Sequence, residues 1–492
     1  MQSEASLNHQ RGGRSPGATT AELSPRLFWL LIVASLALRI PGIFHDFWLD
    51  EIWSYLIVRE LVSPFDVLLQ VHVDNSHPLN SWFLYGLGEQ ATWFVYRIPS
   101  LLFGTGSVAL AGRIMLRRGR AHAAAAIVLV GCSYPLIVYA SEARGYAPLI
   151  FFVLLAIDAL ERYFVTRGWA ALITFWLALV FGFFSHLTFF HAYAALLLWS
   201  GYEEWKRASD FREALANLAA CHAVPLLFLV EFYLVYVRHL RVAGAEPASL
   251  LSVIGETIAV ALGIPGRGAW PWIALLMVVV LLAMGLRAVK RLEPGLVILS
   301  VAGILLIPGL TVFIELQTTL MEPRFFPRYF LVGITLFLLL TAWVVGEQYE
   351  HGGRRFAIAA TFVSLFLIGN LWQVACFIAG GRGHYRDALR YMSHETRDWE
   401  ITVSSNSDFR TRLLLTFYRR YLPPDKTLTF YLHGATDIDN AEWRIVEDLQ
   451  PNAAMPEQID DGHGQGFRLM KIFPFYGLSG CQWSLYQRIR LR

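Results

Sequence analysis

The chain has 492 residues, of which 55% are hydrophobic and 16% are charged, whereas soluble domains carry about 25% charged residues. This composition predicts a polytopic membrane protein. The formal net charge of +3 is too small to indicate a nucleic-acid partner, so we expect none. The four cysteines form no CxxC pair, which argues against a disulfide framework or a zinc site.

The N-terminal segment 1–26 is polar and predicts a flexible cytoplasmic lead-in without a cleavable signal peptide, so the first apolar span acts as an uncleaved anchor. A helix that crosses a bilayer needs about 20 apolar residues. By this measure the sequence predicts about eleven transmembrane helices. They cover residues 27–43, 92–116, 121–140, 146–165, 169–185, 187–203, 214–237, 271–287, 294–314, 329–346 and 356–379.

Lys and Arg favour the cytoplasmic side of a membrane protein. With a cytoplasmic N-terminus, the inside segments hold about twice as many basic residues as the outside loops before the tail. The sequence therefore predicts a multi-pass protein of the inner (plasma) membrane with its C-terminus outside. The segment 238–270 is then an outside loop.

Two segments differ from the spans. The outside loop 44–91 contains short apolar runs broken by Pro64, Pro78 and Gly86, which predict interfacial helices within a transmembrane domain of residues 27–380. The tail 381–492 has more charge and strand-like pieces, and predicts a small extracytoplasmic α/β domain. The expected fold is an all-α polytopic membrane protein with this C-terminal soluble domain.

Asp50 and Glu51 follow the first span in "DFWLDEIWSYLIVRE" and have Trp48, Trp53 and Tyr55 as neighbours. One interpretation is a solvated loop end. The other is a catalytic pair, because aromatic neighbours lower the local dielectric and the pair lies where a lipid-linked substrate presents its polar head.

"VHVDNSHPLN" places His72, Asp74 and His77 near this pair in the sequence. Imidazole and carboxylate groups are ligands for several divalent metals, so a metal site that includes Asp50 is one hypothesis. The other is that His77 forms an ordinary hydrogen bond and Pro78 begins a helix.

Basic residues also lie outside, against the charge trend. They are Arg144 in "YASEARGYAPL" and Arg324 and Arg328 in "MEPRFFPRYF". Arginine is well shaped to bind a phosphate through two contacts. An arginine at the end of a span can also reach lipid head groups, which remains the alternative.

These elements, in this order, resemble the GT-C superfamily of integral-membrane glycosyltransferases. The resemblance is to the bacterial branch related to protein O-mannosyltransferases and the lipid A aminoarabinose transferase. It covers about residues 27–345 and rests on the ordered motifs "WLDEIWSY", "DNSHPLNSWF", "YRIPSLLFG", "YASEARGYAPL" and "FPRYFLVG", with His186 near the outer end of a middle span. Leu79 replaces the second proline usual after His77.

The resemblance implies transfer of a sugar from a polyprenyl-phosphate donor to a lipid, glycan or protein acceptor in the cell envelope, with inversion at C1. Asp50 is then the base or a metal-associated carboxylate, and Glu51 its partner. The donor needs no other cofactor, while a divalent metal stays open. The expected substrate-binding residues are Tyr55, His77, Glu142, Arg144, Tyr146, Arg324, Arg328 and Tyr329.

Two other functions compete with glycosyl transfer. A transporter or flippase for lipid-linked sugars explains the spans and the basic outer residues, but it more naturally places charges in mid-span. A glycan polymerase or ligase is closer in chemistry, and is expected to use a large outer loop late in the chain.

Overall fold

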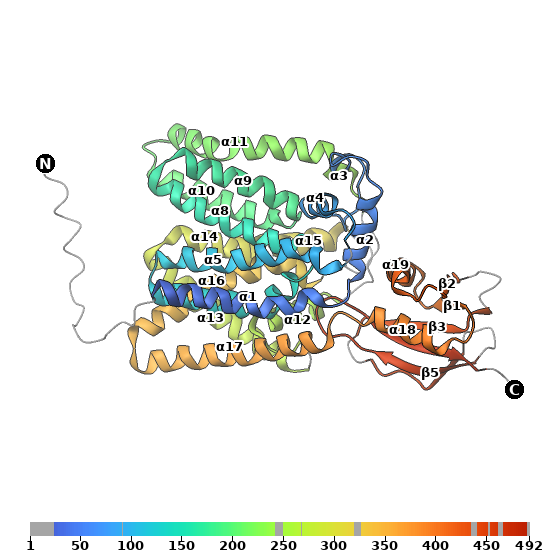
Figure 1. The fold of residues 1–492 in the computed structure, drawn as a ribbon. Coiled ribbons are helices and arrows are strands. Elements are labelled where there is room, and N and C mark those ends of the chain that lie inside the picture. The colour runs from blue at the N-terminus through green and yellow to red at the C-terminus, as the bar shows by residue number, and fades with distance from the viewer. Residues whose placement is uncertain are drawn as a thin grey trace.

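The computed structural model describes residues 24–90, 92–241, 249–266, 268–318, 326–433, 440–450, 453–460 and 466–489. It is a bundle of long helices with a small mixed sheet packed against one end (Figure 1). We call this end of the bundle the sheet end and the elements from α18 to β6 the sheet domain. The fold class expected from the sequence, a mainly helical polytopic protein with a C-terminal α/β domain, is confirmed.

Every predicted span coincides with a helix or with two adjoining helical segments. The helices are α1 (Pro25–Arg39), α5 (Ile98–Leu116), α6 (Arg120–Cys132), α7 (Tyr134–Tyr139), α8 (Tyr146–Thr166), α9 (Trp169–Ser185), α10 (Phe189–Arg207), α11 (Phe211–Val235), α13 (Trp270–Leu292), α14 (Pro294–Val301), α15 (Ile307–Thr318), α16 (Leu331–His351) and α17 (Gly353–Gly380). Within the described residues, seven helical segments are long and apolar enough to cross a membrane. The chain is a multi-pass membrane protein.

Prolines mark two irregular spans. α6 ends at Cys132 and α7 restarts at Tyr134, with Pro135 in its first turn, where a missing N–H costs nothing. A π-helical turn at Ala302–Leu306 joins α14 to α15, immediately before Pro308. The first break brings the chain into the turn 140–145, which carries Arg144 to the sheet end.

The loop 44–91 forms α2 (Leu49–Arg59), α3 (Asp66–Leu69) and α4 (Pro78–Leu87), all at the sheet end (Figure 1). The Trp48 N–H donates to Glu51, which caps the first turn of α2. α4 starts at Pro78 and ends before Gly88, whose φ of 62° favours glycine. The segment 238–270, predicted as an outside loop, contains one further helix, α12 (Leu250–Leu262), which is apolar but short.

The sheet domain begins with α18 (Tyr385–Glu395) and contains α19 (Asp408–Tyr418) and six strands in the order β2-β1-β3-β6-β5-β4. β1 (Glu400–Ser405) lies parallel to β2 (Thr427–Phe430) and to β3 (Trp443–Asp448). β6 (Gln482–Arg488) pairs antiparallel with β3 and with β5 (Gly466–Phe473), and β4 (Gln458–Asp460) forms the far edge.

An aromatic core joins the sheet domain to the bundle. Phe47 and Tyr55 pack on Phe417 of α19, with ring centroids 5.4 and 5.8 Å apart. The Tyr418 hydroxyl donates to the Phe47 carbonyl at 2.9 Å. Tyr385 packs against both Trp48 and Trp483 of β6. Because this core draws on both parts of the chain, the sheet domain fixes the position of α2.

Replacing Phe417 with alanine removes a ring that is 1% exposed at the centre of this joint. We expect the Phe417→Ala variant to lose about 3–5 kcal/mol of unfolding free energy, because a cavity replaces well-packed aromatic contacts. SDS titration of the purified protein in mixed micelles measures this change. Trp399→Ala, at a position that is 66% exposed, is the control, and an equal loss in both variants would contradict the role of the joint.

Candidate active site

A cavity of about 1050 Å³ lies between the sheet end of the bundle and the sheet domain. Its floor includes Asp50, His77, Arg144, Tyr146, His186, Arg328 and Tyr329. Its roof comes from the sheet domain, at Ser407, Phe409 and Arg410 at the start of α19 and at the loops Leu449–Gln450 and Phe475–Gly480, with Trp53 of α2 beside them. The cavity therefore collects residues from the first turn of α2 to the last loop before β6.

Two arginines share one carboxylate oxygen on the cavity floor. Arg144 Nη1 lies 3.3 Å and Arg328 Nη1 lies 3.4 Å from Asp50 Oδ2. Asp50 is in the first turn of α2, where the helix dipole favours a carboxylate, and its side chain is 18% exposed. Two guanidinium groups therefore face one carboxylate at this point of the floor, while Asp74 and Glu256 add two further carboxylates elsewhere in the lining.

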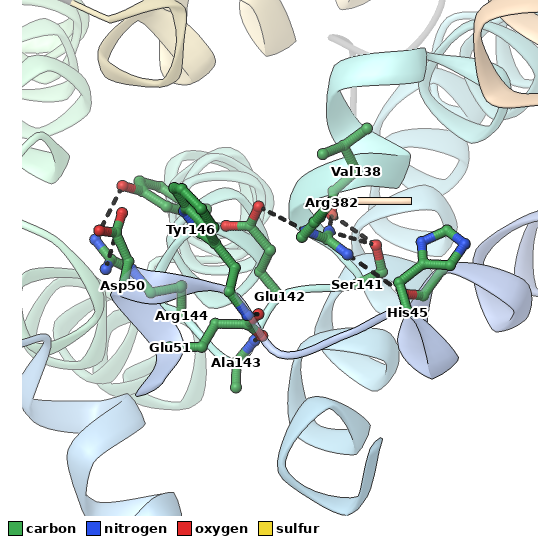
Figure 2. Close-up of polar contacts among 12 residues, drawn as sticks. His45, Asp50, Glu51, Val138, Ser141, Glu142, Ala143, Arg144, Tyr146 and Arg382 are labelled. Carbon is green, nitrogen blue, oxygen red and sulfur yellow. Dashed lines mark hydrogen bonds and ion pairs between the residues drawn. The ribbon is translucent and has the colours of Figure 1, made fainter. Parts of the chain in front are cut away.

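The two guanidinium groups are held by neighbouring side chains. Arg144 donates to Asn75 Oδ1 and, at 3.3 Å, to the Tyr146 hydroxyl (Figure 2). Arg328 stacks over the Phe326 ring at 4.2 Å. The Nε atoms of both arginines are buried and have no hydrogen-bond partner in the described structure. The cluster therefore has unused donor capacity.

His77 and His186 stack beside the arginines with ring centroids 4.6 Å apart. Burial, together with the charges of Arg144 and Arg328, lowers the pKa of His186 to about 3 and that of His77 below its usual value. Both imidazoles are therefore neutral at pH 7. They add polar contacts to the floor without adding charge.

Glu51, predicted as the second catalytic carboxylate, does not line the cavity. Its side chain is 0% exposed and binds Arg97, with Nε to Oε1 at 2.8 Å and Nη2 to Oε2 at 2.6 Å. The backbone N–H groups of Trp48 and Ala143 donate to the same carboxylate (Figure 2). Burial alone would raise the pKa of Glu51, but Arg97 and these hydrogen bonds hold it below its usual value.

Neighbouring residues on a helix point about 100° apart, so Asp50 and Glu51 face different surroundings. Asp50 faces the cavity, whereas Glu51 joins the start of α2, Arg97 at the end of η2 (Trp93–Arg97) and the turn that carries Arg144. The two carboxylates of the predicted pair therefore do not face the same cavity, because Glu51 is buried against Arg97.

Glu142, predicted to bind substrate, is also buried away from the cavity. It accepts from Arg382 at 3.2 Å, and Arg382 in turn donates to the Val138 carbonyl and the Ser141 hydroxyl (Figure 2). This contact joins the end of α17 to the turn after α7. Glu142 pairs with Arg382 because both charges are buried, and a buried charge is stable only when an opposite charge and further hydrogen bonds compensate for the loss of water.

Of the remaining residues predicted to bind substrate, some line the cavity and others do not. Tyr55 is 1% exposed in the aromatic joint and does not line the cavity, so the prediction that it contacts substrate is wrong in this structure. His77, Arg144, Tyr146, Arg328 and Tyr329 do line it. Arg324 lies outside the described residues.

The metal hypothesis does not fit the arrangement around Asp50. His72 packs on Tyr236 and His239, and the described residues contain no cluster of three or more His, Cys, Asp or Glu side chains that could hold an ion. The positions nearest Asp50 Oδ2 are taken by guanidinium groups, which repel a divalent cation. No step below uses a metal.

Sequence reasoning missed Arg97, Arg382 and Asn75. Arg97 lies in the "YRIPS" motif and Asn75 in the "DNSHP" motif, so the sequence shows that both belong to motifs but does not indicate which groups they contact. Arg382 lies at the start of the tail, where no motif marks it.

The bundle of apolar helices, with the cavity between its sheet end and the sheet domain, defines a multi-pass membrane protein. No family model and no curated protein matches the chain. Among solved structures, it is similar to ArnT from Cupriavidus metallidurans bound to undecaprenyl phosphate. The identity is 12%, the match covers 94% of this chain and 98% of that chain, and the TM-score is 0.45.

Replacing Arg97 with methionine leaves the Glu51 carboxylate buried without its cation. We expect Arg97→Met to lose about 3–5 kcal/mol of unfolding free energy, because an unpaired buried charge is strongly destabilising. The double variant Glu51→Gln/Arg97→Met should recover part of this loss in the same SDS titration. A double variant as unstable as the single one would contradict the pairing.

The neutral state of His186 predicts a dependence of stability on pH. Unfolding raises its pKa from about 3 to about 6.5, so the unfolded chain binds more protons and stability falls as the pH drops through this range. Between about pH 7.5 and about pH 5.5 the unfolding free energy of the protein should fall by about 1 kcal/mol more than that of the His186→Asn variant. Asparagine is chosen because it retains a hydrogen-bond acceptor for the Thr188 N–H. If the unfolding free energies of the two proteins change with pH in parallel, the neutral state of His186 in the folded protein is contradicted.

Proposed function

We propose that this protein is a glycosyltransferase that moves a sugar from a polyprenyl-phosphate donor to an acceptor on the extracytoplasmic side of the plasma membrane. The observation that carries the proposal is the floor of the cavity, where two guanidinium groups converge on one carboxylate. A competing transporter does not require this arrangement. The following paragraphs derive what each group does.

Arg144 and Arg328 suit the phosphate of the donor. Each contacts Asp50 through one Nη1 atom only, at distances longer than a strong charge-assisted hydrogen bond, and each retains an unpartnered Nε. A phosphate can therefore bind to both groups without breaking a tight ion pair. As the bond from C1 of the sugar to the phosphate oxygen breaks, negative charge grows on that oxygen, and the guanidinium groups stabilise it.

Asp50 suits the role of general base. Both ion pairs engage its Oδ2 atom, and the contacts of the described residues leave Oδ1 for an acceptor hydroxyl. In the proposed step the acceptor oxygen forms a bond to C1, its proton passes to Asp50, and the bonding electrons leave with the phosphate. A single direct displacement of this kind inverts the configuration at C1.

The cavity also fits a substrate with a lipid tail. It lies at one end of a bundle whose outer helices, such as α11 and α13, present exposed apolar side chains suited to lipid. A prenyl chain can stay among these helices while its phosphate reaches the arginines. The roof covers the reacting groups, which limits attack by water on the donor.

The proposed side of the membrane follows from charge. Arg117, Arg118, Arg207 and Arg291 lie at or beside the ends of α5, α10 and α13. We assign these helix ends to the cytoplasm, because basic residues near helix ends favour that side. The sheet end, with the cavity, then faces outward, and the start of α1 at Pro25 faces inward.

Asp50→Asn tests the proposed base. We expect product formation to fall by about 100-fold or more, because the amide accepts no proton from the acceptor. Cells that carry this variant should accumulate a polyprenyl-phosphate sugar and lose one sugar from an envelope glycan or lipid, as measured by mass spectrometry. Asp387→Asn, on the exposed surface of α18, is the matched control.

Membrane levels of each variant are measured alongside the product, so that loss of protein is separated from loss of chemistry. Full product with Asp50→Asn would overturn the role of Asp50. If deletion of the gene changed only the side of the membrane on which the lipid-linked sugar is found, transport would replace transfer as the function.

A further inference from the structure

An aromatic pair stands beside Asp50, between the bundle and the sheet domain. Trp53 follows Asp50 by three positions on α2, so the two side chains share a face of the helix. The Trp53 ring meets Phe409 of α19 edge to face, with centroids 5.2 Å apart and an interplanar angle of 82°. Both rings line the cavity. The aromatic pair and Asp50 therefore face the same cavity.

Phe409 is 46% exposed although it is a large apolar side chain in the sheet domain. The roof also contains the neutral polar residues Ser407, Gln450 and Ser479, and one charged residue, Arg410. Ser479 is 5% exposed, and its hydroxyl has no hydrogen-bond partner in the described structure. An accessible aromatic ring among neutral polar groups is typical of a site for a small polar ligand with an apolar face.

The charges of the cavity separate the roof from the floor. The roof cation among the described lining residues is Arg410, which pairs with Glu447 at 3.2 Å. The described lining carries three arginines, Arg144, Arg328 and Arg410, and three carboxylates, Asp50, Asp74 and Glu256. On the floor, Arg144 and Arg328 converge on Asp50, where a phosphate can contact both guanidinium groups. On the roof, the charge of Arg410 is paired with Glu447, so the roof suits an uncharged molecule.

The backbone of the roof favours a glycan over an extended peptide. Peptides that bind by strand addition need an exposed sheet edge. The edge strands β2 and β4 do not contribute to the described lining, which in the sheet domain comes from the start of α19 and from loops. A sugar ring needs no sheet edge, because its C–H face packs on an aromatic ring and its hydroxyls bind neutral polar groups.

We propose that Trp53 and Phe409 form the acceptor subsite and that this subsite takes a neutral sugar ring, one hydroxyl of which faces Asp50. The proposal rests on the proposed function, since it assigns the acceptor side of the same reaction. It makes the product a glycosidic bond between two sugars. An acceptor phosphate or a polypeptide hydroxyl is the alternative that the test must separate.

The test uses the purified full-length protein and saturation-transfer NMR with neutral methyl hexosides, mannose 6-phosphate and a serine-containing tripeptide as probes. At least one neutral hexoside should bind, and Phe409→Ala should weaken it by about tenfold through loss of ring stacking. Phe409→Tyr should restore binding. Trp399→Ala removes another exposed ring of the sheet domain that does not line the cavity and should change nothing.

Binding of undecaprenyl phosphate is measured on the same samples. It should persist in Phe409→Ala and weaken in Arg328→Met. Suppose that binding of undecaprenyl phosphate depends on Arg328. The acceptor proposal is then overturned if binding of no neutral hexoside depends on Phe409, or if only binding of the tripeptide or of the sugar phosphate depends on it. If binding of the hexoside depends on Phe409 while binding of undecaprenyl phosphate does not change in Arg328→Met, the acceptor subsite is supported and the donor assignment is wrong.

Discussion

The buried ion pair between Glu51 and Arg97 is the contact on which the geometry of the cavity floor depends. Its carboxylate joins three segments that are far apart in the sequence: the first turn of α2, the start of α5 (through Arg97) and the turn between α7 and α8. Because a buried charge without its partner is so unfavourable, these segments are held in one arrangement. Asp50 and Arg144 are each next to a residue of this junction, so the junction sets the distance between them.

A second level of organisation comes from the sheet domain. Its aromatic contacts with Phe47, Trp48 and Tyr55 fix α2 from above, while Arg382 joins the end of α17 to the turn that precedes Arg144. The roof of the cavity is therefore part of the same packed unit as the floor. This explains how Arg144 and Arg328 on the floor can face Phe409 on the roof across a cavity of about 1050 Å³.

The sequence predicts much of this architecture, and each feature that it predicts has an identifiable physical cause. Apolar runs indicate the helices directly, because the backbone must satisfy its own hydrogen bonds in lipid. The motif order identified Asp50, His77, Arg144 and Arg328 as neighbours, and all of them line the cavity. The sequence could not show which of two adjacent carboxylates is buried, because Arg97 comes from another helix. Nor could it show Arg382 or Phe409, since their contacts depend on how the sheet domain packs.

The order of the strands has a consequence for biosynthesis. β6 is the last strand in chain order, yet it lies inside the sheet between β3 and β5, and its Trp483 packs on Tyr385, which stacks on Trp48. While the ribosome is still making this strand, the helices ahead of it can insert, but the sheet lacks an inner member and α2 lacks its support. The roof of the cavity and the support of α2 are therefore completed only after the helices of the bundle have been made.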